Sequence, residues 1–291
     1  MEIVNCNTCG SSQFNFIFEK ASPLGESFKI VRCKKCRLVQ VNPQPNLNEV
    51  LKYYNNSYFT ERTDRGYDNY YSDKIRSEIS RVFQLNLNDL GFFKWEKEYR
   101  LSNHVSLRSL DIGCAAGYFV DFMRTKGYES EGIEVADGPV EFARNKLGLK
   151  IHKEDFLAWD QDFKNKYDVI TMWATIEHLH KPKETLQKIK KHLNPGGTLI
   201  LSTCRYGILA KWKGLDWRYL NVPEHLYYYS LSGLIQLLKE LDFNSPKSIT
   251  YGSGMTNKSN ANPFFKIKKY FFDRIVKYTN QGDMMAIQVT N

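Results

Sequence analysis

The stretch LDIGCAAGYF, residues 110–119, decides how the rest of the chain is interpreted. An apolar run ends in Asp111, the chain turns at Gly113, and a helix is expected to begin near Gly117. The small residues Gly113, Ala115 and Gly117 let a ligand approach the backbone, and the helix that follows offers unpaired N–H groups. Dinucleotide-binding and nucleoside-binding folds share such a turn, so the turn alone does not separate them.

Acidic residues stand at the ends of the next two expected strands. Glu134 closes the strand GIEV, where its carboxylate can accept both hydroxyls of a ribose, and Asp155 with Phe156 follows the third strand, in position to meet an adenine edge and face. A nicotinamide enzyme presents an acidic residue at the place of Glu134, so this residue does not discriminate by itself. Two structural alternatives stay open: Asp111 fixes the loop, and Phe156 belongs to the core.

From residue 106 onward, apolar strand runs alternate with amphipathic helices. We expect strands at residues 106–113, 129–135, 150–155, 167–174, 197–204, 243–252 and 283–291. We expect helices that begin near Gly117, Gly138, Lys183 and Ser230. This alternation predicts an α/β fold with a mostly parallel sheet that is covered on both faces.

The region from about residue 107 to residue 291 resembles the class I S-adenosylmethionine-dependent methyltransferases. The matching motifs are LDIGCAAGYF for the nucleotide loop, GIEV for the ribose acid, EDF, YDVITMWATIEHL for the fourth strand and LNPGGTLILST before the fifth. The resemblance implies a Rossmann-like, seven-stranded methyltransferase sheet and bound S-adenosylmethionine. The cofactor-binding residues that it implies are Asp111, Gly113, Ala115, Gly117, Tyr118, Glu134, Asp155, Phe156, Trp173 and His178. Ala115 departs from the family pattern, in which a glycine is common.

Four of the six cysteines form two CxxC pairs, Cys6 with Cys9 and Cys33 with Cys36. The first residues show no secretory signal, and in a chain without an export signal such pairs favour a metal over disulfides. Four thiolates at about 2.3 Å make a tetrahedral zinc site with no position for a catalytic water, which predicts a structural zinc ribbon. Reduced free thiols are the alternative.

The sequence divides into three expected parts: a zinc ribbon at 1–45, a helical linker or lid at 46–105, and the methyltransferase domain at 106–291. In the linker, Ile75, Ile79, Val82 and Phe83 recur at helical spacing, as expected for a helix that packs on the domain behind it. The aromatic run YYNNSYF, residues 53–59, either reaches over a ligand or packs.

The N-terminal block resembles that of bacterial methyltransferases with a zinc-binding domain, many associated with surface polysaccharide or modified sugars. Among them the nucleotide-sugar C-methyltransferases place a Glu-His pair after the fifth strand in the active site, and this chain has PEHLYYYS there. Glu224 and His225 are therefore the implied catalytic residues, although those relatives are longer and carry a further C-terminal domain. The implied acceptor is a sugar, nucleotide-sugar or glycan. Of the three tyrosines, some are expected to face the cleft and some the core.

Histidine suits the proton transfer that methylation of a hydroxyl or an α-keto carbon requires. His225 is the candidate base, with Glu224 orienting its ring or binding a substrate hydroxyl; alternatively, His225 only organises its loop. For His178 we favour a structural or cofactor-proximal role over base catalysis. Two tryptophans and Tyr219 precede the pair, and they either stack on a sugar, form a lid or pack the loop.

The formal net charge of +9 is concentrated near the C-terminus, where residues 258–277 hold five Lys and one Arg against one Asp. Residues 263–279 predict a basic, phenylalanine-rich amphipathic helix. Its apolar face either packs on the sheet, which we favour, or contacts a membrane surface. No run approaches the ~20 apolar residues that span a bilayer. We expect a cytoplasmic protein, with peripheral contact at the inner face of the membrane in the second case.

Two other function classes compete with a methyltransferase of sugar-type acceptors. The basic charge and a zinc ribbon also fit an RNA methyltransferase, but the fourth strand ends in TMWATIEHL and lacks the Asn-Pro-Pro-Tyr type of motif that grips a planar base. A binding module that retains the cofactor fold is the third interpretation. The intact loop with Glu134 and Asp155 argues against it.

Overall fold

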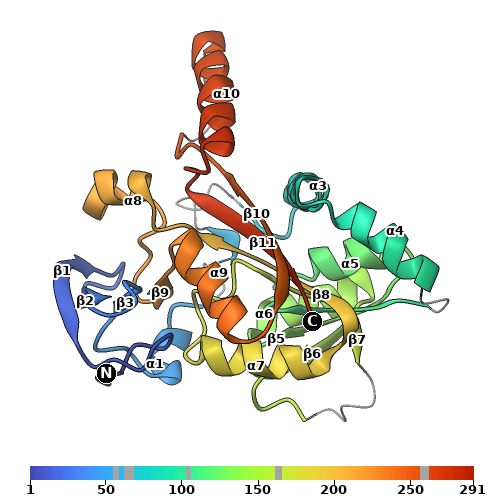
Figure 1. Ribbon diagram of the computed structural model, residues 1–291, viewed down its shortest axis with the longest axis horizontal. Helices are drawn as coiled ribbons and strands as arrows, with labels where there is room; N and C mark the ends of the chain where they lie inside the picture. The colour runs from blue at the N-terminus through green and yellow to red at the C-terminus, as the bar shows by residue number, and fades with distance from the viewer. Residues whose placement is uncertain (55–58, 62–68, 103–105, 161–165, 256–261) are drawn as a thin grey trace.

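The computed structural model describes residues 1–54, 59–61, 69–102, 106–160, 166–255 and 262–291. Two sheets, one of four strands and one of seven, form the framework of these residues (Figure 1). Most of the aromatic run at 53–59 lies outside the described residues, so its predicted role over a ligand has no structural description.

The large sheet has the predicted strands. In sheet order they are β10 (Asn244–Tyr251), β11 (Met284–Thr290), β8 (Leu193–Cys204), β7 (Tyr167–Trp173), β4 (Arg108–Ile112), β5 (Glu129–Glu134) and β6 (Lys150–Lys153). The strands β4 to β8 run parallel, and β11 is antiparallel to both of its neighbours. The predicted α/β, mostly parallel sheet is confirmed. The strand β8 begins at Leu193, before the predicted start at residue 197.

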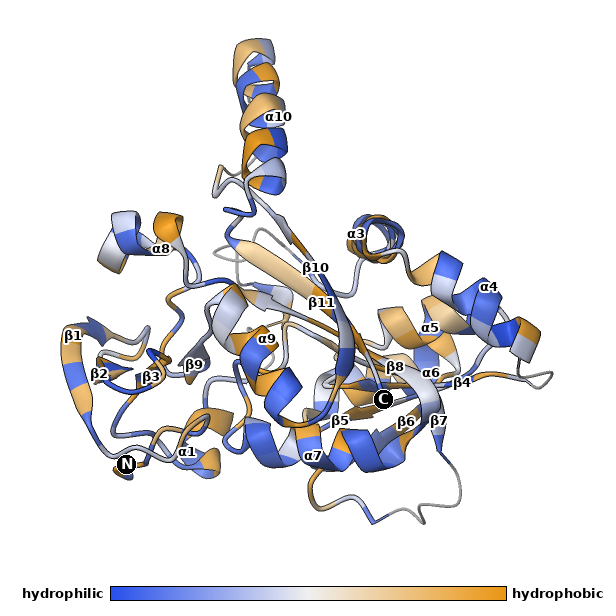
Figure 2. Ribbon diagram, in the orientation of Figure 1, coloured by the Kyte–Doolittle hydropathy of each residue, from blue (hydrophilic) through white to orange (hydrophobic). Residues whose placement is uncertain are grey.

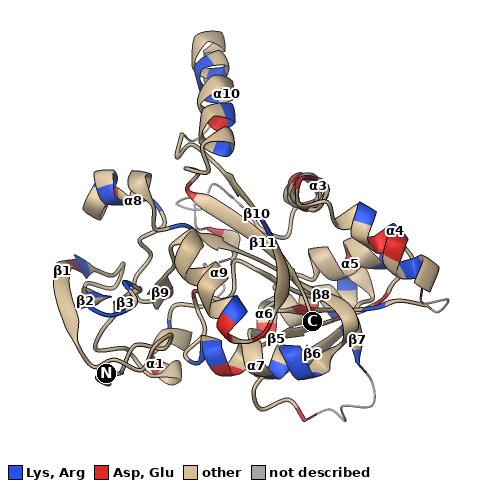
Figure 3. Cartoon of the chain, in the orientation of Figure 1, with Lys and Arg blue, Asp and Glu red and all other residues tan. Residues whose placement is uncertain are grey.

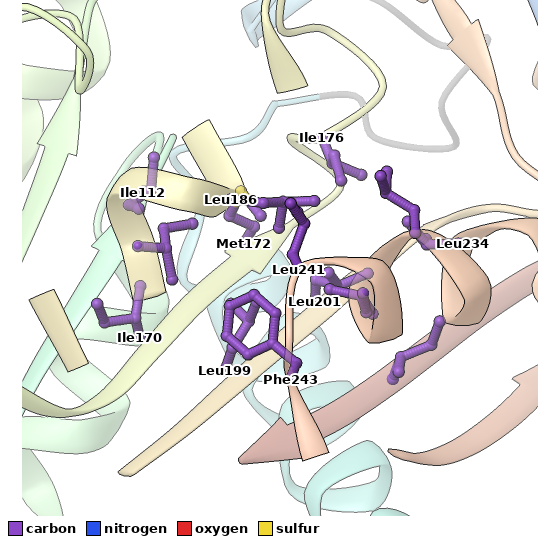
Figure 4. Close-up of a cluster of buried hydrophobic side chains, with 14 of the residues drawn as sticks. Ile112, Ile170, Met172, Ile176, Leu186, Leu199, Leu201, Leu234, Leu241 and Phe243 are labelled. Carbon is purple, nitrogen blue, oxygen red and sulfur yellow. The ribbon is translucent and has the colours of Figure 1, made fainter. Parts of the chain in front are cut away.

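Helices cover both faces of this sheet. On one face, α7 (Pro182–His192) and α9 (Leu231–Glu240) pack against apolar side chains of β4, β7, β8 and β11 (Figure 4). On the other face lie α3 (Asp73–Leu90), α4 (Phe92–Ser102) and α5 (Tyr118–Thr125). The helix α6 (Asp137–Leu147) packs beside α5 and β6. The helices α5, α6, α7 and α9 each begin within one residue of the predicted start.

The linker helix α3 packs on the large sheet as predicted. The Ser72 side chain caps its N-terminus, and Gly91 ends it with a φ of 76°. Ile75, Ile79 and Phe83 are buried against α5 and the sheet, whereas Val82 is exposed. A short helix, α1 (Leu47–Leu51), precedes it.

The small sheet draws strands from two distant parts of the chain. Its order is β1 (Phe14–Ala21), β2 (Ser27–Cys33), β3 (Val39–Val41) and β9 (Tyr227–Tyr228), all antiparallel. The strand β9 follows β8 after the short helices α8 (Ile208–Lys213) and η2 (Gly214–Asp216). The cysteine-containing block therefore shares a sheet with the segment that carries the Glu-His pair.

The basic helix α10 (Pro263–Tyr278) connects β10 with β11 and projects away from the sheets (Figure 1). Val276 is its one buried residue. The expectation that its apolar face packs on the sheet is wrong, because that face is exposed to solvent. In the part of the chain that is described, no helix has the length and apolarity needed to cross a membrane.

Candidate active site

The loop after β4 requires glycine at its first turn. Gly113 has a φ of +69°, and a Cβ added there would lie 2.5 Å from Cγ2 of Thr175. Its N–H donates to the carbonyl of Ile133 at 2.8 Å. Ala115 adopts a φ of 45° without being a glycine, and its N–H donates to Oε2 of Glu134 at 2.9 Å. The loop is thus held against the carboxyl end of β5.

The Glu134 carboxylate organises this edge of the sheet. Its Oε1 accepts the N–H groups of Val135 and Ala136 at 2.8 and 2.9 Å, in addition to the Ala115 bond on Oε2. Burial raises the pKa of Glu134, while these three N–H groups oppose the rise. A carboxylate accepts about four hydrogen bonds, so Oε2 has room for one more.

Asp111 lies behind the loop and is 4% exposed. Its Oδ1 accepts a hydrogen bond from the hydroxyl of Thr171 at 2.6 Å. Burial raises the pKa of Asp111 to about 8, and the nearby charge of Glu134 adds to the rise. The folded protein therefore holds a proton on Asp111 that the unfolded chain releases at lower pH.

This shift predicts a pH-dependent effect of Asp111→Asn. Because the folded pKa lies above the unfolded one, Asp111 contributes most stability below its unfolded pKa and loses it as the pH rises toward about 8. The amide keeps the acceptor for Thr171 without the charge, so the variant should gain in melting temperature over the wild type between pH 5 and pH 8, roughly the window between the two pKa values. Thermal melts of both proteins across this pH range measure the difference in melting temperature. The control Asp137→Asn changes an exposed residue, and its difference in melting temperature from the wild type should not vary with pH in this way. If the difference between Asp111→Asn and the wild type were independent of pH, the raised pKa of Asp111 would be contradicted.

Two tyrosines before α3 cover the loop. The hydroxyl of Tyr118 donates to the carbonyl of Tyr70 at 2.7 Å, and the two rings stack with centroids 5.4 Å apart. Tyr71 packs against Phe142 of α6, and burial together with the charge of Glu134 raises its pKa to about 12. The linker thus contacts Tyr118, at the end of the predicted cofactor loop.

Two predicted cofactor residues are packed in aromatic clusters. Phe156 is 4% exposed and lies against Trp159 and His192. Trp173 packs against Phe83 of α3 and against α5. These contacts favour the core alternative for Phe156 over stacking on an adenine. Asp155 lies at the end of β6, where its Oδ1 accepts the N–H of residue 157 at 2.7 Å.

Two histidines meet beside the ends of β7 and β8. The imidazoles of His178 and His225 lie edge to face, with centroids 4.6 Å apart. Nδ1 of His225 is 2.9 Å from the carbonyl of Tyr219, and since a carbonyl only accepts, Nδ1 carries the proton and Nε2 is the basic nitrogen. Nδ1 of His178 is hydrogen-bonded to the hydroxyl of Tyr54 at 2.7 Å. His180 lies apart, with its Nε2 bound to a backbone carbonyl.

Glu177 completes this cluster and was missed by the sequence prediction. Its side chain is 1% exposed, and ligating atoms of Glu177, His178 and His225 lie within 4.8 Å of one another. A carboxylate and two imidazoles at this separation can share a proton or hold a cation. Glu177 stands next to His178 in the quoted TIEHL, but nothing in that motif showed that it turns inward. Tyr54 belongs to the aromatic run at 53–59, but nothing in that run showed that its hydroxyl binds His178.

Backbone hydrogen bonds of the segment around the Glu-His pair connect the two sheets. The N–H groups of Leu226 and Tyr227 donate to the carbonyl of Glu177 at 2.8 and 3.2 Å, and Val41 of β3 donates to Leu226 at 2.9 Å. The three tyrosines 227–229 are all buried at 1–2% exposure. They divide between two core clusters and not between cleft and core as expected. Glu224 is buried at 0% exposure beside this segment.

A cavity of about 380 Å³ opens between the β1–β2 turn and residues 215–224. Its polar lining includes Lys20, Ser22, Asp216, Arg218, Asn221 and Glu224. Trp217 also borders it but is 2% exposed, with its indole N–H bound to Asp283 at 3.1 Å, so it packs the loop. Trp212 is 79% exposed and lies on α8.

The four CxxC sulfurs converge on one point. Sγ of Cys6 is 3.3 Å from that of Cys36, Sγ of Cys9 is 3.5 Å from that of Cys33, and all four lie within 4.8 Å of one another. Tetrahedral zinc with bonds of about 2.3 Å separates its sulfurs by about 3.8 Å, so the donor set fits the ion. Burial raises the pKa of Cys33, but the N–H groups of Cys36 and Lys35 outweigh it and lower the pKa to about 7.

Comparison with known proteins gives a family match over most of the chain. A sequence profile described as Methyltransferase domain matches residues 67–245. Proteins named ubiquinone biosynthesis O-methyltransferase are similar: that of Marinobacter nauticus is 29% identical over 103 residues (33% of this chain, 43% of the relative), and that of Pectobacterium carotovorum 25% over 134 residues (44% and 54%). The chain spans about half the length of these curated relatives.

Solved structures of similar fold are more distant in sequence. A SAM dependent methyltransferase from Archaeoglobus fulgidus is 16% identical, with a TM-score of 0.48 and coverage of 72% of this chain and 99% of that chain. An S-adenosylmethionine dependent methyltransferase from Mesorhizobium loti is 12% identical, with a TM-score of 0.49 and coverage of 64% and 91%.

Proposed function

The chain belongs to the methyltransferase domain family, and on this premise we propose that it methylates a sugar, nucleotide-sugar or glycan-type small polar acceptor with S-adenosylmethionine. The observation that carries the proposal is the loop after β4, whose Ala115 N–H is held by Glu134 at the carboxyl ends of parallel strands. In open α/β sheets, ligands bind at these ends. When bound, S-adenosylmethionine supplies a methyl group on a sulfonium centre.

The cofactor site is proposed along the carboxyl ends of β4, β5 and β7. Gly113 and Gly117 form the turn because both have a positive φ and neither has space for a Cβ, and Oε2 of Glu134 receives one ribose hydroxyl. The Glu134 carboxylate, which three backbone N–H groups stabilise, places negative charge near a cationic ligand.

The acceptor is proposed to bind beside the Glu-His pair. The polar cavity that Glu224 borders combines carboxylate, amide and cationic side chains, a set that suits the hydroxyls of a sugar. Nε2 of His225 is the proposed base, since Nδ1 donates to Tyr219. It removes the proton from the acceptor oxygen or carbon while the acceptor attacks the methyl group in line. The relatives named O-methyltransferases favour transfer to oxygen.

We further propose that the four clustered cysteines hold a structural zinc ion. The sulfur separations of 3.3 and 3.5 Å and the hydrogen bonds to Cys33 support this assignment. Four thiolates leave no coordination position for substrate, so the ion stabilises the fold and takes no part in methyl transfer.

Replacement of Glu134 tests the cofactor site. Glu134→Gln should weaken S-adenosylmethionine binding about 10- to 150-fold, because a hydrogen bond to a charged group contributes about 1.5–3 kcal/mol. Calorimetric titration of the full chain measures the change. The matched control is Glu129→Gln, at the exposed start of the same strand, which should bind the cofactor like the wild type. Equal affinities in all three proteins would remove Glu134 from the site.

The acceptor class is tested by supplying pools of candidate molecules. The protein should add a methyl increment to a nucleotide-sugar or glycan pool in the presence of S-adenosylmethionine, as seen by mass spectrometry, with phenolic acceptors run in parallel. Methylation of the phenols alone would reject the sugar-type acceptor while keeping the methyltransferase assignment.

A further inference from the structure

The helix α10 turns its polar side toward the body of the protein. Lys277 pairs with Asp89 of α3 at 2.5 Å, and Oδ1 of Asp273 accepts the N–H of Ser253 at 3.0 Å. The hydroxyl of Thr250 in β10 donates to the carbonyl of Val276 at 3.2 Å. These attachments lie in the C-terminal half of the helix and fix its orientation.

The opposite side of α10 is an exposed apolar stripe. Its members recur every three or four residues along the helix and are 55–91% exposed: Phe264, Ile267, Phe271, Ile275 and Tyr278. Figure 2 shows the hydrophobic segments on the projecting helix. Removing these side chains from water is favourable, and contiguous exposed apolar surface of this kind marks a binding face. We therefore expect a binding partner to cover the stripe.

The net charge of the helix α10 indicates which kind of partner the stripe binds. Five basic residues, at 266, 268, 269, 274 and 277, stand against one acidic residue, Asp273, which gives the helix a net charge of 5 − 1 = +4. Figure 3 shows this concentration of Lys and Arg on α10. Lys268 and Arg274 are three or four residues from members of the stripe, whereas Lys269 pairs with Asp273 and Lys277 pairs with Asp89. Cations next to apolar and aromatic side chains complement a surface of anionic headgroups over hydrocarbon.

A second copy of this helix fits the face less well. Two helices of the same +4 charge repel each other at close range. A helix pair also needs apolar residues at a strict heptad spacing, and the heptad position after Phe271 is Arg274. The stripe instead follows the period of a straight helix, which suits a flat surface. We propose that the stripe of α10 binds the surface of a membrane that carries anionic lipid.

Vesicle flotation of the full chain tests this proposal. The protein should float with vesicles of equal parts phosphatidylcholine and phosphatidylglycerol, remain unbound to phosphatidylcholine alone, and bind less as salt increases. The variant Phe264→Ser/Phe271→Ser should lose at least about tenfold in vesicle affinity, since two buried phenylalanines are removed. The control Phe16→Ser alters another exposed phenylalanine, on β1, and should bind like the wild type.

A second variant separates the charge from the apolar contact. Lys266→Glu/Lys268→Glu changes two exposed residues of α10 and should weaken binding to the anionic vesicles as well. Far-UV circular dichroism checks that each variant is folded. The proposal would be overturned if neither variant weakened binding to the vesicles. It would also be overturned if the protein did not bind vesicles and instead formed a concentration-dependent dimer that Phe264→Ser/Phe271→Ser abolished. The second result would assign the face to another copy of the chain.

Discussion

Cys33→Ser is expected to remove the zinc ion and to abolish the native unfolding transition of the full chain. Structural zinc contributes an apparent 10–16 kcal/mol or so in small zinc-binding peptides, which is comparable with the total stability of about 5–15 kcal/mol of a typical domain. Cys6 and Cys33 also belong to the buried cluster that contains Tyr227 and Tyr229, so loss of the ion leaves unpaired thiols within a shared core. Zinc content by mass spectrometry and a thermal melt measure the two effects.

A buried cysteine outside the cluster provides the matched control. Cys114→Ser places a hydroxyl in an apolar environment at a cost of about 1–3 kcal/mol, and should lower the melting temperature without changing the zinc content. Treatment of the wild type with a strong chelator should reproduce the Cys33→Ser result. Purified protein without zinc, with an unchanged melt for Cys33→Ser, would contradict the structural zinc site.

The sheet was predictable from the sequence because its signals are local and long. Buried strands such as YDVITMW are nearly continuous apolar runs, and the helix α9 begins after the capping residue Ser230. The loop residues Gly113 and Glu134 were predictable for the same reason, since each directly follows or ends such a run. The pattern of apolar residues along the chain was therefore sufficient to predict these strands, helices and loop residues.

Other features depend on pairings across the chain that no local pattern shows. The strand β9 has two residues and exists through its pairing with β3. The backbone of Glu177 lies beside the Glu-His pair because its carbonyl accepts the N–H groups of Leu226 and Tyr227, more than forty residues later in the numbering. For α10, the amphipathic pattern identified an apolar face but not its neighbour. The attachments of Asp273 and Lys277 decide that this face points outward.

These pairings connect the cysteine block with the candidate base. Val41 of β3 donates to the carbonyl of Leu226, the residue after His225, and Leu226 in turn donates to Glu177. The position of His225 therefore depends on both sheets at once. We therefore expect that loss of the cysteine block would disturb the position of His225.

His225→Gln is expected to lower kcat by about 10²- to 10⁴-fold, the usual contribution of a positioned general base. The glutamine amide can still donate a hydrogen bond toward the carbonyl of Tyr219, which Nδ1 of His225 contacts at 2.9 Å, but it has no basic nitrogen in place of Nε2. If His225 acts as the base, the acid limb of the kcat profile against pH should disappear in the variant. Cofactor affinity should stay unchanged, because the loop after β4 is not altered.

The same variant separates base catalysis from loop organisation. A His225 that only holds its loop predicts near-normal kcat for His225→Gln, low activity for His225→Ala, and an unchanged pH profile in both. The control His180→Gln alters a histidine outside the cluster, whose Nε2 contacts the carbonyl of Pro45 at 2.9 Å, and should keep wild-type kcat. Near-normal turnover by His225→Gln would transfer the search for the base to His178 and Glu177, whose ligating atoms lie within 4.8 Å of His225.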